Sequence, residues 1–261
     1  MRKYCRIWLQ LTRLAIGTYF SNALDYTSYF IGKLVRFGFF LVLIGSLFRF
    51  TDSLAGYTKH EAVLFFLTFN FIDVCSQALF RGIYQFRRDI QLGNFDFVLS
   101  KPVDPLFYSL SRLTDITDLV FLLPIVALIS WTMNAIPALH SLSSILLYAG
   151  MLFLGMIIVL GIHIISASVT IWQVESENFI WLYREAMTIG RFPPEIYAAP
   201  IQLIFTVVIP IITIVAFPVK AALQVINGKW LAFALIYAVL FLRLSLFLWG
   251  RALKKYSSAS S

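Results

Sequence analysis

The chain has 261 residues, of which 60% are hydrophobic and only 13% are charged. A soluble domain of this length cannot bury so much apolar surface, so lipid must solvate much of the chain. The excess of Lys and Arg gives a formal net charge of +8. Because these residues flank apolar stretches, we expect them to face anionic lipid headgroups and not nucleic acid.

Residues 1–28 are predicted to form a helix that lies in the cytosolic interface of the membrane. Arg6, Gln10 and Arg13 are spaced as i, i+4 and i+7, which places them on one polar stripe of an otherwise apolar helix. A frayed basic tail is the alternative. Because Arg6 and Arg13 interrupt the apolar run, the segment does not have the pattern of a signal peptide.

Six apolar stretches have about the length needed to cross a hydrocarbon core of about 30 Å. None of them shows the alternation of a barrel strand, so they are predicted to be helices. The sequence therefore predicts an all-α, polytopic membrane protein with six transmembrane helices in a single domain. The predicted spans are Ile31–Phe48, Ala62–Phe80, Leu119–Ile136, Ile145–Ile171, Ile201–Phe217 and Trp230–Trp249.

The distribution of Lys and Arg sets the predicted orientation. With both termini in the cytosol, all of these residues lie on the inner side except Arg49, Lys59, Lys220 and Lys229, in keeping with the positive-inside rule. This orientation makes the connections 81–118 and 172–200 and the tail 251–261 cytosolic.

The connection 172–200 is predicted to contain an amphipathic helix that ends before Pro193 and Pro194. We expect its charges to form a solvated face, with pairing to another protein as the alternative. These charges are Glu175, Glu177, Arg184 and Glu185.

Polar residues inside the predicted spans have two readings each. Asp73 and Arg243 lie at similar depth, so they could form an ion pair, or each could reach water or headgroups at the inner surface. A polar face on the second span could line a cavity or bond a neighbouring helix. His163 is expected to be a packing residue and not a proton relay. The cavity or gating candidates are Asn70, Asp73, Gln77, Gln202 and Pro210.

The stretch GNFDFVLSKPVDPLFY, residues 93–108, lies in the first cytosolic connection. Gly93 is placed to end a short helix with a positive φ, and Asp104 with Pro105 has the pattern of an N-cap followed by the first helical residue. We predict a helix, a rigid elbow and a second helix. The apolar residues Phe95 and Phe97 could tuck against the spans or fit a groove on a soluble partner.

Few residues have the spacing of a catalytic site. The sequence has no G-x-x-x-x-G-K-[ST] phosphate loop and no H-E-x-x-H motif. The three histidines are scattered, and Cys5 and Cys75 are both predicted to face the reducing cytosol. The chain alone is therefore not expected to hydrolyse ATP or to hold a metal.

Two regions resemble a known family. The run FRRDIQLGNFDFVLSKPVDPLF is similar to the corresponding cytosolic loop of permease subunits of type V ATP-binding-cassette (ABC) exporters. The region from Arg184 to Leu223 resembles the elbow and fifth span of the same family, with a proline inside the span and the pair FP at its end. The resemblance implies a multi-pass protein of the plasma (inner) membrane of a bacterium.

This resemblance implies partners and site residues. Two permeases, identical or homologous, would form a dimer, and two ATPase subunits would hold ATP and Mg²⁺, so this chain would carry no cofactor. The transport cavity would lie between the permeases, lined by the first, second and fifth spans, and residues 218–229 would dip back from the outer surface. The ATPase-docking residues would be Gly93, Asn94, Phe95, Asp96, Phe97, Lys101, Pro102, Asp104 and Pro105.

Two further alternatives stay open on the sequence. Pro210 removes one backbone hydrogen bond from the fifth span, which permits a kink for gating or a static kink that serves packing. The alternative function is an ion-coupled secondary transporter, which needs ionisable groups inside the spans, and Asp73 is a narrow basis for it.

Overall fold

The computed structural model describes residues 2–173 and 178–257, and in these ranges the secondary structure is helical. Glu175, Glu177 and the last four residues lie outside the described part. Five helices are long and apolar enough to cross a membrane, and they confirm five of the predicted spans and the polytopic all-α fold. They are α2 (Ala23–Leu47), α3 (Lys59–Phe80), α7 (Ile116–Asn134), α8 (Leu142–Trp172) and α12 (Gly228–Lys255).

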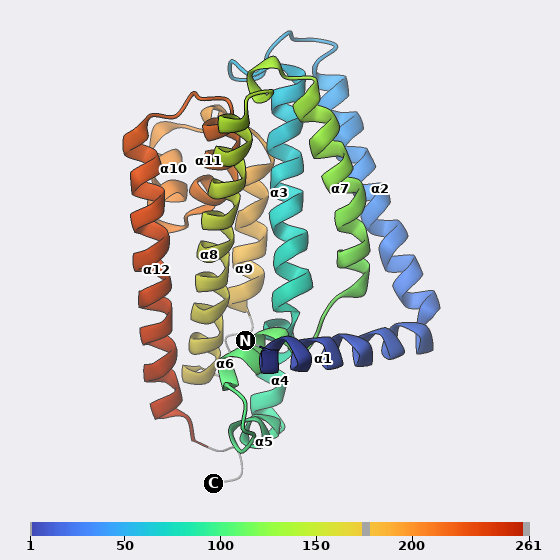
Figure 1. The fold of residues 1–261 in the computed structure, drawn as a ribbon, viewed down its shortest axis with the longest axis vertical. Helices are drawn as coiled ribbons and strands as arrows, with labels where there is room; N and C mark the ends of the chain where they lie inside the picture. Colours follow the sequence, from blue (N-terminus) through green and yellow to red (C-terminus); the bar gives the residue numbers. More distant parts are fainter. Residues whose placement is uncertain (1, 174–177, 258–261) are drawn as a thin grey trace.

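These helices run side by side in one bundle, and α12 ends at the same end of the bundle where α1 lies (Figure 1). We call this the terminal end, and the other the opposite end. Within the most apolar window of each helix, 61% of residues are buried in α3, against 11% in α2 and 17% in α12. The centre of the bundle is therefore α3, while α2 and α12 present apolar faces outward.

The long helices α3, α7, α8 and α12 begin at residues that satisfy their first backbone N–H groups. Thr58 and Glu61 form a capping box at the start of α3. Asp115 accepts the N–H groups of Thr117 and Asp118 at the start of α7, and Asn227 accepts that of Trp230 in α12. These caps fix where each helix enters the bundle.

The first helix, α1 (Arg2–Ser21), lies across the terminal end of the bundle (Figure 1). The ring of Tyr4 packs edge-on against Phe107, with ring centroids 4.8 Å apart, and Lys3 donates a hydrogen bond to the carbonyl oxygen of Pro102. Leu14 and Phe20 leave 71% and 73% of their surface exposed, as a helix half-immersed in the membrane interface would require.

The segment after α8 differs most from the sequence prediction. Beginning with α9 (Asn178–Met187) and η3 (Thr188–Arg191), the chain reaches Glu195, which accepts a hydrogen bond from Tyr57 Oη at 3.2 Å. Tyr57 lies just before α3, at the opposite end of the bundle. Residues 178–195 therefore run from one end of the bundle to the other, and they are not confined to a cytosolic connection.

The predicted fifth span, Ile201–Phe217, is not one helix. It is divided among α10 (Ala199–Leu203), the π-helical η5 (Ile204–Val208) and α11 (Ile211–Ala222), with a bend of 100° at the break. Lys220, near the end of α11, forms an ion pair with Glu195, just before α10. The start of α10 and the end of α11 thus both lie near the opposite end of the bundle. The bent helix pair, residues 199–222, enters the bundle from this end and returns to it.

The position predicted for the outer re-entrant segment is also wrong. Residues 218–229 were expected to dip back, but Pro218 and Lys220 belong to α11, and α12 begins at Gly228. The bent helix pair reaches deepest into the bundle near Val207, which precedes residues 218–229 in the sequence. There, Tyr237 Oη of α12 donates a hydrogen bond to the carbonyl oxygen of Val207 at 2.8 Å. Pro210 stands at the bend as the N-cap of α11.

Four short helices connect α3 to α7 at the terminal end. They are η1 (Arg81–Gln85), α4 (Phe86–Gln91), α5 (Asn94–Leu99) and α6 (Pro105–Ser111). Gly93 has a φ of +70°, and the Asp104 carboxylate accepts the N–H of Phe107 at 2.8 Å, as the sequence predicted. The predicted elbow is shorter than expected, because residues 94–99 form α5.

This connection is packed as one rigid piece onto the end of α12. Phe95 is fully buried, with its ring centroid 5.0 Å from that of Phe86 and 5.1 Å from that of Tyr256. Tyr256 Oη also donates to Asp96 Oδ1 at 2.9 Å. Burial and this hydrogen bond raise the pKa of Tyr256 to about 12, so the phenol remains a donor.

Gly82 allows the close contact between η1 and α6. A Cβ atom at this position would lie 2.0 Å from the carbonyl oxygen of Ser109, which is too short for any pair of unbonded atoms. We expect Gly82→Ala to lower the free energy of unfolding by about 1–3 kcal/mol, because the backbones must separate. Thermal unfolding of the detergent-solubilised protein measures this change.

The matched control is Gly150→Ala in α8, where an added Cβ meets nothing within 4 Å. It should leave the melting temperature unchanged or slightly raised, because alanine favours a helix over glycine. Equal melting temperatures for the two variants would contradict the close packing of η1 on α6.

Phe95 and Phe97 lie on opposite sides of α5 and should respond differently to truncation. Phe95→Ala removes a buried ring and should cost about 3–5 kcal/mol of stability. Phe97 is 69% exposed, so Phe97→Ala should change the stability by no more than about 0.5 kcal/mol. The same unfolding measurement compares them, and a larger loss for Phe97→Ala would show that α5 is turned the other way.

Candidate functional site

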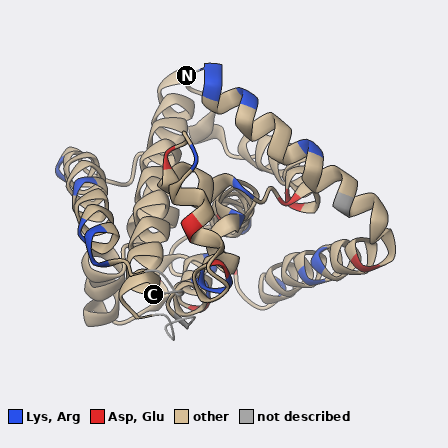
Figure 2. Cartoon of the chain, turned by 90° about the horizontal axis from the view of Figure 1, so that it is seen from below, with Lys and Arg blue, Asp and Glu red and all other residues tan. Residues whose placement is uncertain are grey.

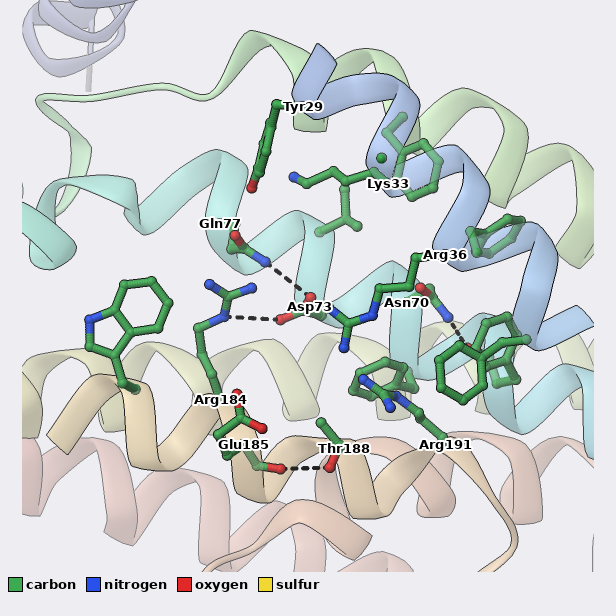
Figure 3. Close-up of a pocket in the computed structure, with 18 of the residues that line it drawn as sticks. Tyr29, Lys33, Arg36, Asn70, Asp73, Gln77, Arg184, Glu185, Thr188 and Arg191 are labelled. Carbon is green, nitrogen blue, oxygen red and sulfur yellow. Dashed lines mark hydrogen bonds and ion pairs between the residues drawn. The ribbon is translucent and has the colours of Figure 1, made fainter. Parts of the chain in front are cut away.

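A cavity of about 540 Å³ lies between α2, α3 and the segment formed by α9 and η3 (Figure 3). Phe121 of α7 completes its wall. The cavity is both aromatic and strongly charged. Its charged lining residues are Lys33, Arg36, Arg81, Arg184, Arg191, Asp73 and Glu185.

The polar face predicted on the second span lies on the cavity wall. Asn70, Asp73 and Gln77 follow one another along α3 at helical spacing and all line the cavity. Gln77 Nε2 donates to Asp73 Oδ2 at 3.0 Å, and Arg184 Nε lies 4.0 Å from Asp73 Oδ1 (Figure 3). The face meets the cavity and also bonds a neighbouring segment, which are the two readings that the sequence left open. A part for these residues in transport stays a prediction.

The possible ion pair between Asp73 and Arg243, one of the two readings that the sequence left open, is not formed in the described structure. Arg243 is exposed on α12, and α12 packs on α8 and not on α3. Asp73 has Arg184 as its cationic neighbour instead. The residues share a depth, as the sequence indicated, but depth along two helices does not decide which faces meet.

Two carboxylates at the start of α7 neutralise the charge of two further cations of the cavity. Lys33 forms an ion pair with Asp118, and Arg81 lies 3.5 Å from Asp115. Burial would raise the pKa of Asp115, but a hydrogen bond from Thr117 and the charge of Arg81 outweigh it and hold this pKa below its usual value. The two carboxylates thus stay close to positive charge at the base of α7.

Arg36 and Arg191 enter the cavity from opposite walls, α2 and η3 (Figure 3). The guanidinium of Arg191 lies over the ring of Phe40 at 4.6 Å and that of Phe69 at 5.1 Å. The sequence reading placed Arg191 in a cytosolic connection and so missed it. The spacing of Arg184, Thr188 and Arg191 as i, i+4 and i+7 is the signal that could have shown one polar helical face.

Gln202 and Pro210 do not belong to this cavity. Both lie in the re-entrant pair, where Gln202 Nε2 donates to the carbonyl oxygen of Tyr197 at 2.8 Å, and Pro210 marks the 100° bend. A gating role for Pro210 stays a prediction. His163 is buried in α8, where its Nδ1 lies 2.8 Å from the carbonyl oxygen of Val159.

The α5 tip, residues 92–104, protrudes at the terminal end of the bundle (Figure 1). Phe95 points inward and is part of the core, so it is not available to a partner as the docking prediction required. Phe97 is the large exposed ring of the tip. Other residues of the predicted docking set that are exposed are Asn94, Lys101, Pro102 and Asp104.

The face around the tip carries several basic side chains. Seen from this end, Lys and Arg recur along α1 (Figure 2). Lys101 lies over the ring of Tyr108, with its Nζ 4.7 Å from the centroid. An exposed phenylalanine flanked by Lys101 and Asp104 can bind a partner that offers an apolar groove with charges of complementary sign at its edges.

Within residues 2–173 and 178–257, no group of three or more His, Cys, Asp or Glu side chains is arranged to hold a metal ion. Cys5 and Cys75 are free thiols.

The comparison with protein families agrees with this architecture. The model of the ABC-2 family transporter proteins matches residues 34–260, which covers the second half of α2, α3, the tip, α9, η3 and α12. No curated protein and no solved structure matches the chain. The chain belongs to the ABC-2 family of transporter proteins and is therefore a multi-pass membrane subunit of an ABC transporter.

Proposed function

We propose that the chain is the permease of an ATP-driven exporter, energised by a separate ATPase subunit that docks on the α5 tip. The family supports the permease role, and the ATPase is a different subunit in such transporters. The observation that carries the proposal is the contrast within α5: Phe95 anchors the tip in the core, while Phe97 leaves 69% of its surface exposed.

The anchoring suits the tip to transmit force. A docked partner that pushes on Phe97 moves α5, and α5 is joined to the end of α12 by Phe95 and by the hydrogen bond between Asp96 and Tyr256. Arg112 holds Asp89 of α4 at 2.8 Å, and Gly82 packs η1 against α6. The displacement therefore passes into α3 and α12 with little loss to bending.

The rest of the proposal concerns assembly and orientation. Two copies of the ATPase, which hold ATP and Mg²⁺, act on two permeases, identical or homologous, in a plasma (inner) membrane with the terminal end in the cytosol. The sparsely buried helix α2 offers a face for the second permease, and lipid covers the remaining apolar surface. The cavity between α2, α3 and residues 178–191 then belongs to the translocation path, and the bend at Pro210 is a hinge.

Docking on the tip predicts a specific loss of the partner. Phe97→Asp places a desolvated charge at the centre of the docking surface, so the amount of ATPase that co-purifies in mild detergent should fall at least tenfold. ATP-driven transport in proteoliposomes should fall with it. Size-exclusion chromatography should show that the variant permease remains folded, because Phe97 supports no core contact.

The matched control is Phe50→Asp, which makes the same change at a ring that is 90% exposed at the opposite end of the bundle. This variant should retain its ATPase. If Phe97→Asp also retains the ATPase, the tip is not the docking surface. Transport that follows an ion gradient without any ATPase would favour the secondary-transporter alternative.

A further inference from the structure

Arg36 and Arg191 lie near the middle of the membrane-spanning part of the bundle. Arg36 precedes the end of α2 by 11 residues, or about 16 Å at the helical rise of about 1.5 Å per residue. Phe69, which faces Arg191, follows the start of α3 by 10 residues, or about 15 Å. A guanidinium at this depth is costly, and such residues are kept where they bind something.

Each of the other three cations of the cavity lies within 4.0 Å of a carboxylate oxygen, but these two do not. Lys33, Arg81 and Arg184 lie beside Asp118, Asp115 and Asp73. Among the described residues, no carboxylate lies within 4.0 Å of Arg36 or Arg191. Glu185 is the remaining acid on the wall, and it can neutralise at most one of the two charges. Among the described residues, the carboxylates of the cavity and of α7 therefore leave at least one of the two positive charges without an anion.

The surface next to the two guanidinium groups is aromatic. Arg191 lies against Phe40 and Phe69, and the wall also includes Phe37, Phe66 and Phe121. The volume of the cavity, about 540 Å³, falls within the range of small-molecule sites. A ligand that satisfies both features needs an anionic head and an apolar body.

We propose that the cavity binds an amphiphile with an anionic, phosphate-like head group, and that Arg36 and Arg191 hold this head between them. Guanidinium groups bind phosphate oxygens in forked, charge-assisted pairs, and the aromatic wall accommodates the apolar chain. The inference rests on the proposed function, in which this cavity belongs to the translocation path, and it names the class of substrate.

The test measures binding to the purified full-length chain in an uncharged maltoside detergent. The probes are dioctanoyl phosphatidic acid, dioctanoyl phosphatidylcholine and inorganic phosphate, each titrated by calorimetry. We expect phosphatidic acid to bind at least tenfold more tightly than phosphatidylcholine, because choline neutralises the head. Inorganic phosphate should bind at least tenfold more weakly than phosphatidic acid, because it lacks the chains. This comparison needs no variant.

Variants then locate the site. Arg36→Gln and Arg191→Gln should each weaken binding of phosphatidic acid at least fivefold, and Arg36→Lys, which keeps the charge, should weaken it less than Arg36→Gln. Arg243→Gln is the matched control, because Arg243 is an intramembrane cation on α12 outside the cavity, and it should bind as the wild type does.

Three results would overturn the proposal: equal affinity for the two lipids, equal affinity for phosphatidic acid and inorganic phosphate, or an equal loss of affinity in Arg243→Gln.

Because the binding measurement uses neither nucleotide nor ATPase, it is independent of docking. Loss of lipid selectivity with the ATPase still bound overturns only the ligand class. Selective binding in a chain that captures no ATPase supports the ligand site and overturns the ATP-driven mechanism.

Discussion

The cost of placing a guanidinium in hydrocarbon is the constraint on which the architecture depends. Arg184 and Arg191 lie on a segment that runs the length of the bundle, so their side chains must turn away from lipid. The polar face of α3 meets them, with Asp73 beside Arg184, and aromatic rings cover Arg191. The cavity is the space that this inward-facing charge requires, and α2 and α7 close it with Phe37 and Phe121.

A second feature joins this cavity to the α5 tip. The helix α3, which supplies the polar wall, continues at the terminal end into η1, and η1 is locked against α6 through Gly82. Phe95 fixes the tip to the last turn of α12. In the proposed mechanism, one stiff connection therefore links the surface that a partner would push to the helix that lines the cavity, without a separate relay between them.

Local patterns were enough to predict the capping positions of the tip but not its surface. Gly93 and Asp104 adopt their predicted roles because a left-handed turn and an N-cap depend on residues a few positions away. Phe95 and Phe97 are two identical residues in one short helix. Which of them is buried depends on Trp249 and Tyr256, which lie more than 150 residues further along the chain, so the predicted docking set included one core residue.

The sequence by itself determined the membrane class, five of the six spans and the caps at Gly93 and Asp104, because chain length, hydropathy and capping are local properties. Only the tertiary structure decided that residues 178–195 run through the bundle, that 199–222 form a bent pair, and that Asp73 meets Arg184. When a charged residue is judged from the sequence alone, it is assigned the full free-energy cost of placing its charge in lipid. In the folded bundle, a carboxylate or an aromatic wall from another helix lowers that cost, and such neighbours exist only after the helices have packed.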